Sequence, residues 1–201
     1  MNHDWTAMYA MHDALRRELE QLAKLTARTD DDPRRLLASA VGWELFKKAL
    51  HIHHTAEDQA LWPPLRETLA ARPDDLALLD AMEAEHATID PLIDAIDHGS
   101  EPLGDLVESL RTNLTAHLRH EEDEAIPLMD ATITAEQLQN FGGLHAAGIG
   151  PDAPRIFPWL LDGAPGETVT TMLAPLPEPV RAAFETDWRP AYTTLTRWPT
   201  T

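Results

Sequence analysis

Two short stretches of the chain carry a histidine and a glutamate at the same spacing. His53 lies four residues before Glu57 in the stretch HHTAEDQALWP, and His117 lies four residues before Glu121 in HLRHEEDEAIP. On an α-helix this i, i+4 spacing turns through about 400°, so the two side chains of each pair point in nearly the same direction. Each stretch can therefore offer one imidazole nitrogen and one carboxylate oxygen to the same point.

Two further histidines, His12 and His86, each lie on the apolar stripe of a segment that precedes one of these pairs. The resulting pattern, H…HxxxE…H…HxxxE, would bring four imidazoles and two carboxylates into one core. Carboxylates can bridge two cations while neutral imidazoles bind each of them, and a donor set of nitrogen and oxygen suits iron or manganese. A single HxxxE pair arises readily by chance, as His120 and Glu124 show. Hydrogen-bonded core histidines are the alternative explanation for each lone histidine.

The expected burial of the two glutamates also points to a cation. An unpaired carboxylate buried in a helical bundle costs on the order of several kcal/mol. No lysine or arginine falls on the inferred apolar stripes near Glu57 or Glu121. A metal ion is therefore the natural counter-charge for these two side chains.

Four segments position these residues, because their apolar side chains recur every three or four positions, as in amphipathic helices. The first spans about residues 4–28, and the second opens at Asp32-Pro33 with an N-cap followed by proline. The third begins after Pro73 and the fourth near Pro102. Because the connections are short, consecutive helices should be antiparallel. The sequence therefore predicts an all-α, up-down-up-down four-helix bundle.

The last third of the chain has a different composition, with most of the prolines and glycines and three of the six tryptophans. A short helix is expected between Thr134 and Phe141, where the two glycines that follow would end it. We expect the bundle to occupy residues 1–141 and a Pro-rich, partly helical extension to occupy residues 142–201. One short amphipathic helix is expected in the extension around Phe184. The large apolar residues indicate that the extension packs on the bundle.

The composition excludes several partners and sites. The formal net charge of −18 would repel nucleic acid and anionic membrane surfaces. The absence of cysteine excludes disulfides and sulfur ligands, so any metal must be held by nitrogen and oxygen. No secretory signal and no window of about 18 apolar residues is apparent, which predicts a cytoplasmic protein that does not cross a membrane.

The histidine and glutamate pattern resembles the hemerythrin HHE cation-binding domain over about residues 4–130. This resemblance implies a helical bundle that holds two non-haem irons, bridged by an oxo or hydroxo group when oxidised. Carried over residue by residue, the resemblance implies the following iron ligands: terminal His12, His53, His86 and His117, and bridging Glu57 and Glu121. Glu122 competes with Glu121, because oxygen-carrying hemerythrins have an aspartate five residues after the last histidine. The internal repeat favours Glu121.

The sequence departs from the oxygen-carrying hemerythrins at one ligand. Those proteins have an additional histidine on the third helix, one turn from the first. Here the positions one turn either side of His86 are Met82 and Asp90. Water, Tyr9 or Asp90 could take the place of the missing imidazole, and the site is expected to be more open.

The helical spacing does not place the remaining histidines among the expected ligands. His51, His54 and His120 lie off the inward stripe and are expected to be solvated or to lie behind the ligands. His145 is expected in a loop without a partner.

The resemblance leaves the function open between binding and reaction. A small ligand such as O2, NO or peroxide is expected at the di-iron site, and loss of the fifth histidine favours enzymatic turnover of peroxide or NO, with rapid autoxidation. The alternative is a reversible oxygen carrier, store or sensor without turnover. A ferritin-like iron oxidase ranks lower, because it requires a Glu-x-x-His motif on each of two helices and only Glu83-x-x-His86 is convincing.

Overall fold

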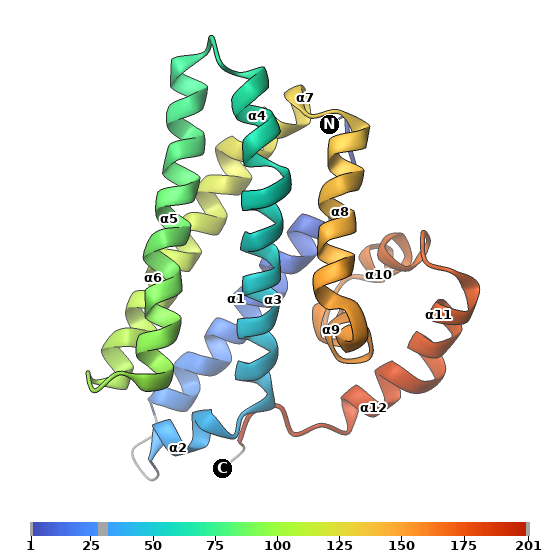
Figure 1. Ribbon diagram of the computed structural model, residues 1–201. Helices are drawn as coiled ribbons and strands as arrows, with labels where there is room; N and C mark the ends of the chain where they lie inside the picture. Colours follow the sequence, from blue (N-terminus) through green and yellow to red (C-terminus); the bar gives the residue numbers. More distant parts are fainter. Residues whose placement is uncertain (1, 28–31, 200–201) are drawn as a thin grey trace.

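The computed structural model describes residues 2–27 and 32–199, and all regular structure within these ranges is helical (Figure 1). Four long helices form the body of the protein: α1 (Thr6–Thr26), α3 (Val41–Ala60), α5 (Pro73–His98) and α6 (Leu103–His120). Helices α1 and α5 each contact both α3 and α6, so the four helices enclose one core. The prediction of an all-α fold is confirmed, whereas the alternating direction of the helices stays a prediction from the short connections.

Two apolar clusters fill the core on either side of the histidine positions. One contains Leu19 and Phe46 and extends along the parts of α1 and α3 that lie next to α2. The other contains Trp62, Met82 and Met129 and lies toward the opposite end of the bundle. The predicted ligands lie near the boundary between these clusters, as His86 does between Met82 and Ile89 on α5. Any charge placed there is therefore shielded from water on both sides, which raises the cost of leaving it uncompensated.

The second predicted helix is divided in two. Helix α2 (Pro33–Ala38) begins where the carboxylate of Asp32 accepts a hydrogen bond from the backbone N–H of Arg34. It ends at Ala38 with Ser39 as its C-cap, and α3 starts at Val41. After α3 the chain continues through the short helix α4 (Trp62–Thr68).

The end of α6 contains an irregular turn at the second glutamate motif. Residues Glu121–Ala125 form one wider π-helical turn before the chain resumes as α7 (Ile126–Thr132). Such turns rotate the side chains that follow relative to a regular helix, and they are frequent at functional sites. Here the turn begins at Glu121, so it controls how the two adjacent glutamates point.

Helix α8 (Ala135–Ile149) is longer than the sequence predicts. The side chain of Thr134 accepts a hydrogen bond from the backbone N–H of Gln137, and the side chain of Gln137 accepts one from the backbone N–H of Thr134, so a capping box starts the helix. The helix then continues through Gly142-Gly143, so the prediction that these glycines end it is wrong. Glycine only weakens a helix, and packing of α8 along α3 outweighs that cost. The predicted division between residues 141 and 142 falls inside this helix.

The rest of the extension is more helical than expected. A 3₁₀ turn at Gly150–Asp152 leads into four short helices: α9 (Ala153–Leu160), α10 (Gly166–Leu173), α11 (Glu178–Ala183) and α12 (Arg189–Thr193), with a π-helical turn at Phe184–Trp188. Residues of α9 and α12 join the main core cluster, and Trp159 is fully buried. The C-terminal segment returns to α1, where the indole Nε1 of Trp198 donates to the buried carboxylate of Glu18 at 2.6 Å. The extension thus covers one side of the bundle (Figure 1).

None of the helices in the described parts of the chain combines the length and the apolar character that a membrane crossing requires.

Candidate metal centre

The side chains predicted as ligands all point into the core and meet there. The six residues are buried, with exposed fractions of 3% or less: His12, His53, Glu57, His86, His117 and Glu121. They come from α1, α3, α5, α6 and the π-helical turn, so every long helix contributes at least one. Their role as ligands stays a prediction, but the structure brings the whole predicted set into one place.

One half of the site joins α1, α3 and the π-helical turn. His12 Nε2 lies 3.1 Å from His53 Nε2 and 3.1 Å from Glu121 Oε2. His53 Nε2 also lies 3.3 Å from Glu57 Oε1. Donor atoms of these four residues all lie within 4.8 Å of one another. This separation is what two or more ligands of one small cation require.

The other half of the site contains three imidazoles. His86 Nε2 lies 3.2 Å from His117 Nε2, and the ring of His54 stacks on that of His86 with centroids 3.9 Å apart. Donor atoms of His54, His86 and His117 all lie within 4.8 Å of one another. Glu57 Oε2, 3.4 Å from His86 Nε2, links this half to the first.

His54 is the residue that the sequence interpretation missed. It was expected off the inward stripe, yet its exposed fraction is 3%. Burial lowers the pKa of His54 to about 4, although Asp90 partly offsets this effect, so the ring is neutral and keeps a free lone pair at pH 7. The doublet His53-His54 was visible in the sequence. Only the position of α5 against α3 places the second histidine beside His86.

The two side chains considered as replacements for a fifth imidazole, Asp90 and Tyr9, are placed differently. The side chain of Asp90 is 66% exposed, and its Oδ1 lies 3.7 Å from His54 Nδ1, so it faces the outer side of that ring. Tyr9 is half-buried against the cluster around Trp62 and Met82, where burial and the charges of Glu122 and Glu121 raise its pKa. His54 is therefore a further candidate for the place of the missing imidazole, because its donor atom lies within 4.8 Å of those of His86 and His117.

The two central carboxylates fit a metal better than they fit a metal-free core. Throughout residues 2–27 and 32–199, neither oxygen of Glu57 or of Glu121 has a hydrogen-bond partner, although imidazole nitrogens lie as close as 3.1 Å. Burial and the charge of Glu121 raise the pKa of Glu57 well above its usual value. Burial also acts to raise the pKa of Glu121, but His12 and the other imidazoles outweigh it and lower that pKa. Cations placed between these atoms would satisfy both carboxylates and use the nitrogen lone pairs.

A second layer of carboxylates holds the outer nitrogens of three rings. Glu122 Oε1 lies 2.8 Å from His12 Nδ1, Asp58 Oδ1 lies 3.0 Å from His86 Nδ1, and Glu85 Oε2 lies 2.8 Å from His117 Nδ1. Such contacts fix the orientation of a metal-binding imidazole and raise its basicity. Each of these rings therefore has its Nε2 directed inward.

Glu121 and Glu122 have distinct positions, which separates the two candidates for the bridging carboxylate. Glu121 is fully buried and faces His12 Nε2, whereas Glu122 faces His12 Nδ1 and forms a bidentate pair with Arg16 at 2.8 Å. Burial raises the pKa of Glu122, but its hydrogen bonds with His12 and Arg16 outweigh this and lower it to about 2. Because of the π-helical turn, Glu121 faces Nε2 and Glu122 faces Nδ1 of the same His12 ring.

His145 also differs from its expected place. It lies in α8 and not in a loop, and its ring centroid is 5.5 Å from that of His53 and 4.7 Å from that of Phe141. Burial lowers the pKa of His145 to about 4, so the ring is neutral.

Metal affinity should rise with pH up to about 9. Burial lowers the pKa of His12, but Glu121 and Glu122 outweigh it and raise the pKa to about 9, so the metal-free protein holds a proton on this ring at pH 7. A metal at Nε2 must displace that proton, so affinity should increase by roughly tenfold for each pH unit between 7 and 9. Competition of Co²⁺ between the protein and a chelator of known pH dependence measures this slope. A flat profile between pH 7 and 9 would contradict the assigned proton.

Comparison with known proteins agrees with this geometry. The family model described as the hemerythrin HHE cation binding domain matches residues 3–129, which is more than half of the chain. Searches of curated proteins and of solved structures find no match.

Proposed function

This chain belongs to the hemerythrin HHE cation-binding family, and we propose that its core holds two non-haem irons that bind small diatomic ligands. His12 and His53 would bind one iron, His54, His86 and His117 the other, and Glu57 and Glu121 would bridge them. The observation that carries this proposal is the meeting of five buried imidazoles and two buried carboxylates, with the carboxylate oxygens unpartnered among the described residues.

The donor atoms support iron over the common alternatives. The chain has no cysteine, and structural zinc sites use four ligands around a single ion. Seven inward donor side chains are too many for one such ion. Two carboxylates between two groups of imidazoles match a dinuclear site of nitrogen and oxygen donors, which suits iron or manganese. The family to which the chain belongs adds weight to iron.

The unequal division of the imidazoles supports ligand binding at one iron. Three imidazoles and the bridging carboxylates would fill most positions of the iron next to His86. Only two imidazoles would hold the iron next to His12, so we place the O2 or NO ligand on that side of the site. Iron held there would supply a Lewis acid to a bound diatomic ligand.

Reversible binding is better supported than turnover. The fully buried polar side chains among the described residues are the six predicted ligands together with His54 and Glu18. Glu18 is held by Trp198 and Arg17 on the far side of α1, so it is not a proton donor to the site. The structure therefore supports a carrier, store or sensor of O2 or NO, and peroxide or NO turnover becomes the second candidate. Rapid autoxidation was expected because the fifth histidine is missing from its usual place. If His54 is a ligand, the site has five imidazoles and this reason no longer applies.

The ferritin-like alternative loses its main support. Glu83 would have to point inward with His86, but its side chain is 46% exposed and pairs with Arg66 at 2.5 Å. The glutamate of this Glu-x-x-His motif therefore faces solvent.

Mixing the reduced, iron-loaded protein with oxygen tests the proposal. We expect an absorption change within milliseconds that reverses when oxygen is removed, because His54 completes the ligands of one iron. The variant His54→Gln should instead oxidise irreversibly, with a lifetime shorter by at least about tenfold. His51→Gln is the matched control, because His51 is exposed on the same helix. Stopped-flow absorption measures all three proteins.

Irreversible oxidation of the unmodified protein, together with catalytic removal of peroxide, would replace the carrier with an enzyme. Equal behaviour of His54→Gln and the unmodified protein would remove His54 from the ligand set.

A further inference from the structure

The internal repeat of the bundle is broken at one residue behind the metal centre. Aligning His12 with His86 and His53 with His117 pairs Met11 with Glu85. Glu85 holds the outer nitrogen of His117 at 2.8 Å. The corresponding nitrogen of His53, Nδ1, has no hydrogen-bond partner in the part of the chain that the structure describes. The thioether of Met11 thus takes the position that the carboxylate of Glu85 has in the other half of the bundle.

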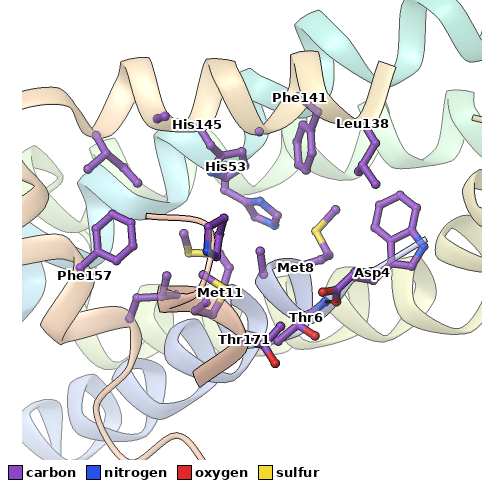
Figure 2. A pocket seen from close by; sticks show the side chains of 18 of the residues that line it. Asp4, Thr6, Met8, Met11, His53, Leu138, Phe141, His145, Phe157 and Thr171 are labelled. Carbon is purple, nitrogen blue, oxygen red and sulfur yellow. Dashed lines mark hydrogen bonds between the residues drawn. The ribbon is translucent and has the colours of Figure 1, made fainter. Parts of the chain in front are cut away.

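A cavity lies at this position. It has a volume of about 370 Å³ and is lined by residues of α1, α3, α8, α9 and α10, including His53 and Met11. Figure 2 shows Leu138, Phe141 and His145 of α8 along one wall and Met8 and Met11 of α1 across the space. The volume is within the range of sites for small organic molecules, which is roughly 300–1,000 Å³.

The walls of the cavity are mostly apolar, with a few polar side chains among them. Its apolar side chains include Met8, Phe141, Phe157, Leu160 and Met172, and Asp4 is the one acidic residue among the described lining residues. Two imidazole nitrogens in this lining, His53 Nδ1 and His145 Nε2, are buried without a hydrogen-bond partner within residues 2–27 and 32–199. Buried polar atoms of this kind are normally satisfied, and ligand pockets use a few of them to orient an apolar molecule.

We propose that this cavity binds a small neutral organic molecule whose apolar body packs between α1 and α8 and whose hydroxyl or carbonyl oxygen accepts a hydrogen bond from His53 Nδ1. The oxygen would take the place of the carboxylate that the repeat lacks. A hydroxyl group suits the site best, because it can also donate to His145 Nε2. An anion is disfavoured by Asp4 and by the net charge of −18.

The proposed hydrogen bond from His53 depends on the proposed metal centre. The cavity itself does not depend on it. A metal at Nε2 leaves the proton of His53 on Nδ1, which makes that atom a donor toward the cavity. An acceptor on this nitrogen raises the basicity of the imidazole, as carboxylates do for the other three rings. Occupation of the cavity and occupation of the metal site should therefore strengthen each other by the same factor.

Benzyl alcohol and toluene are suitable probes, because they differ by the hydroxyl group alone. Calorimetry on the full chain should give a Kd for benzyl alcohol on the order of a millimolar or tighter. In the metal-loaded protein, benzyl alcohol should bind about fivefold more tightly than toluene, the worth of one neutral hydrogen bond. In the metal-free protein this preference should shrink.

Two glycines of α8 provide a matched pair of variants. Gly142 lines the cavity and Gly143 does not, and a Cβ added at either one meets no atom within 4 Å. Gly142→Leu should therefore weaken binding of both probes by at least about tenfold, while Gly143→Leu should leave it unchanged. Equal binding by the two variants, or no binding to the unmodified protein at millimolar concentrations, would overturn the proposal.

The variant Met11→Glu tests the polar contact separately. A carboxylate at this position should reach His53 Nδ1 as Glu85 reaches His117, so the preference for benzyl alcohol over toluene should disappear. An unchanged preference would overturn the contact with His53. If the protein takes up no metal but binds the probes, and Gly142→Leu weakens that binding, the proposed ligand cavity stands and the di-iron centre is rejected. If the protein takes up metal but binds neither probe, the di-iron centre stands and the ligand cavity is rejected.

Discussion

Replacing Glu121 with alanine should empty the metal centre. Iron content should fall from about two per chain to near zero, because this carboxylate faces His12 and His117 and would contact both ions. Elemental analysis after growth with iron measures the content. Asp123→Ala is the matched control, because Asp123 lies in the same π-helical turn but is exposed. One tightly held zinc in the unmodified protein would contradict the di-iron proposal.

The neighbouring variant Glu122→Ala should have a smaller effect. Glu122 contacts the outer nitrogen of His12 and is anchored by Arg16, so its loss should weaken metal affinity by roughly 10- to 100-fold without preventing loading at excess metal. Equal metal loss in Glu121→Ala and Glu122→Ala would mean that the two carboxylates do not have the separate roles assigned here.

Removal of the metal should lower the melting temperature by at least about 15 °C. Each ion present at about a thousand times its Kd stabilises the folded state by roughly 4 kcal/mol. In a chain of this size each kcal/mol corresponds to about 2–4 °C. Without metal, Glu57 and Glu121 stay in a core closed on both sides by apolar clusters, and no cation compensates them.

Differential scanning calorimetry of the chelated and reloaded protein measures this difference. The variant Glu121→Ala is the control, since its melting temperature should not respond to metal. An unchanged melting temperature of the unmodified protein after complete chelation would show that the site is not coupled to folding.

Helical periodicity is enough to predict the helical fold and the six residues that point into the core. A period of three to four residues fixes which side chains share a face of a helix, and burial of the apolar face then fixes where that face points. His53 with Glu57 and His117 with Glu121 therefore converge without knowledge of how the helices pack. The same local rule could not decide the length of α8, because packing on α3 overrode the two glycines.

The surroundings of these six residues depend on how the helices pack against one another. His54 lies off the stripe of its own helix, and it becomes a candidate ligand because α5 brings His86 against its ring. Because of the π-helical turn, the side chains of Glu121 and Glu122 point in different directions. In a regular helix, the register of the helix would have decided which of the two faces the core. The cavity beside His53 exists because α8 packs on α3 while α9 and α10, distant in sequence, pack on α1. Contacts between segments far apart in the chain depend on packing between helix faces, and the period of any one helix carries no information about them.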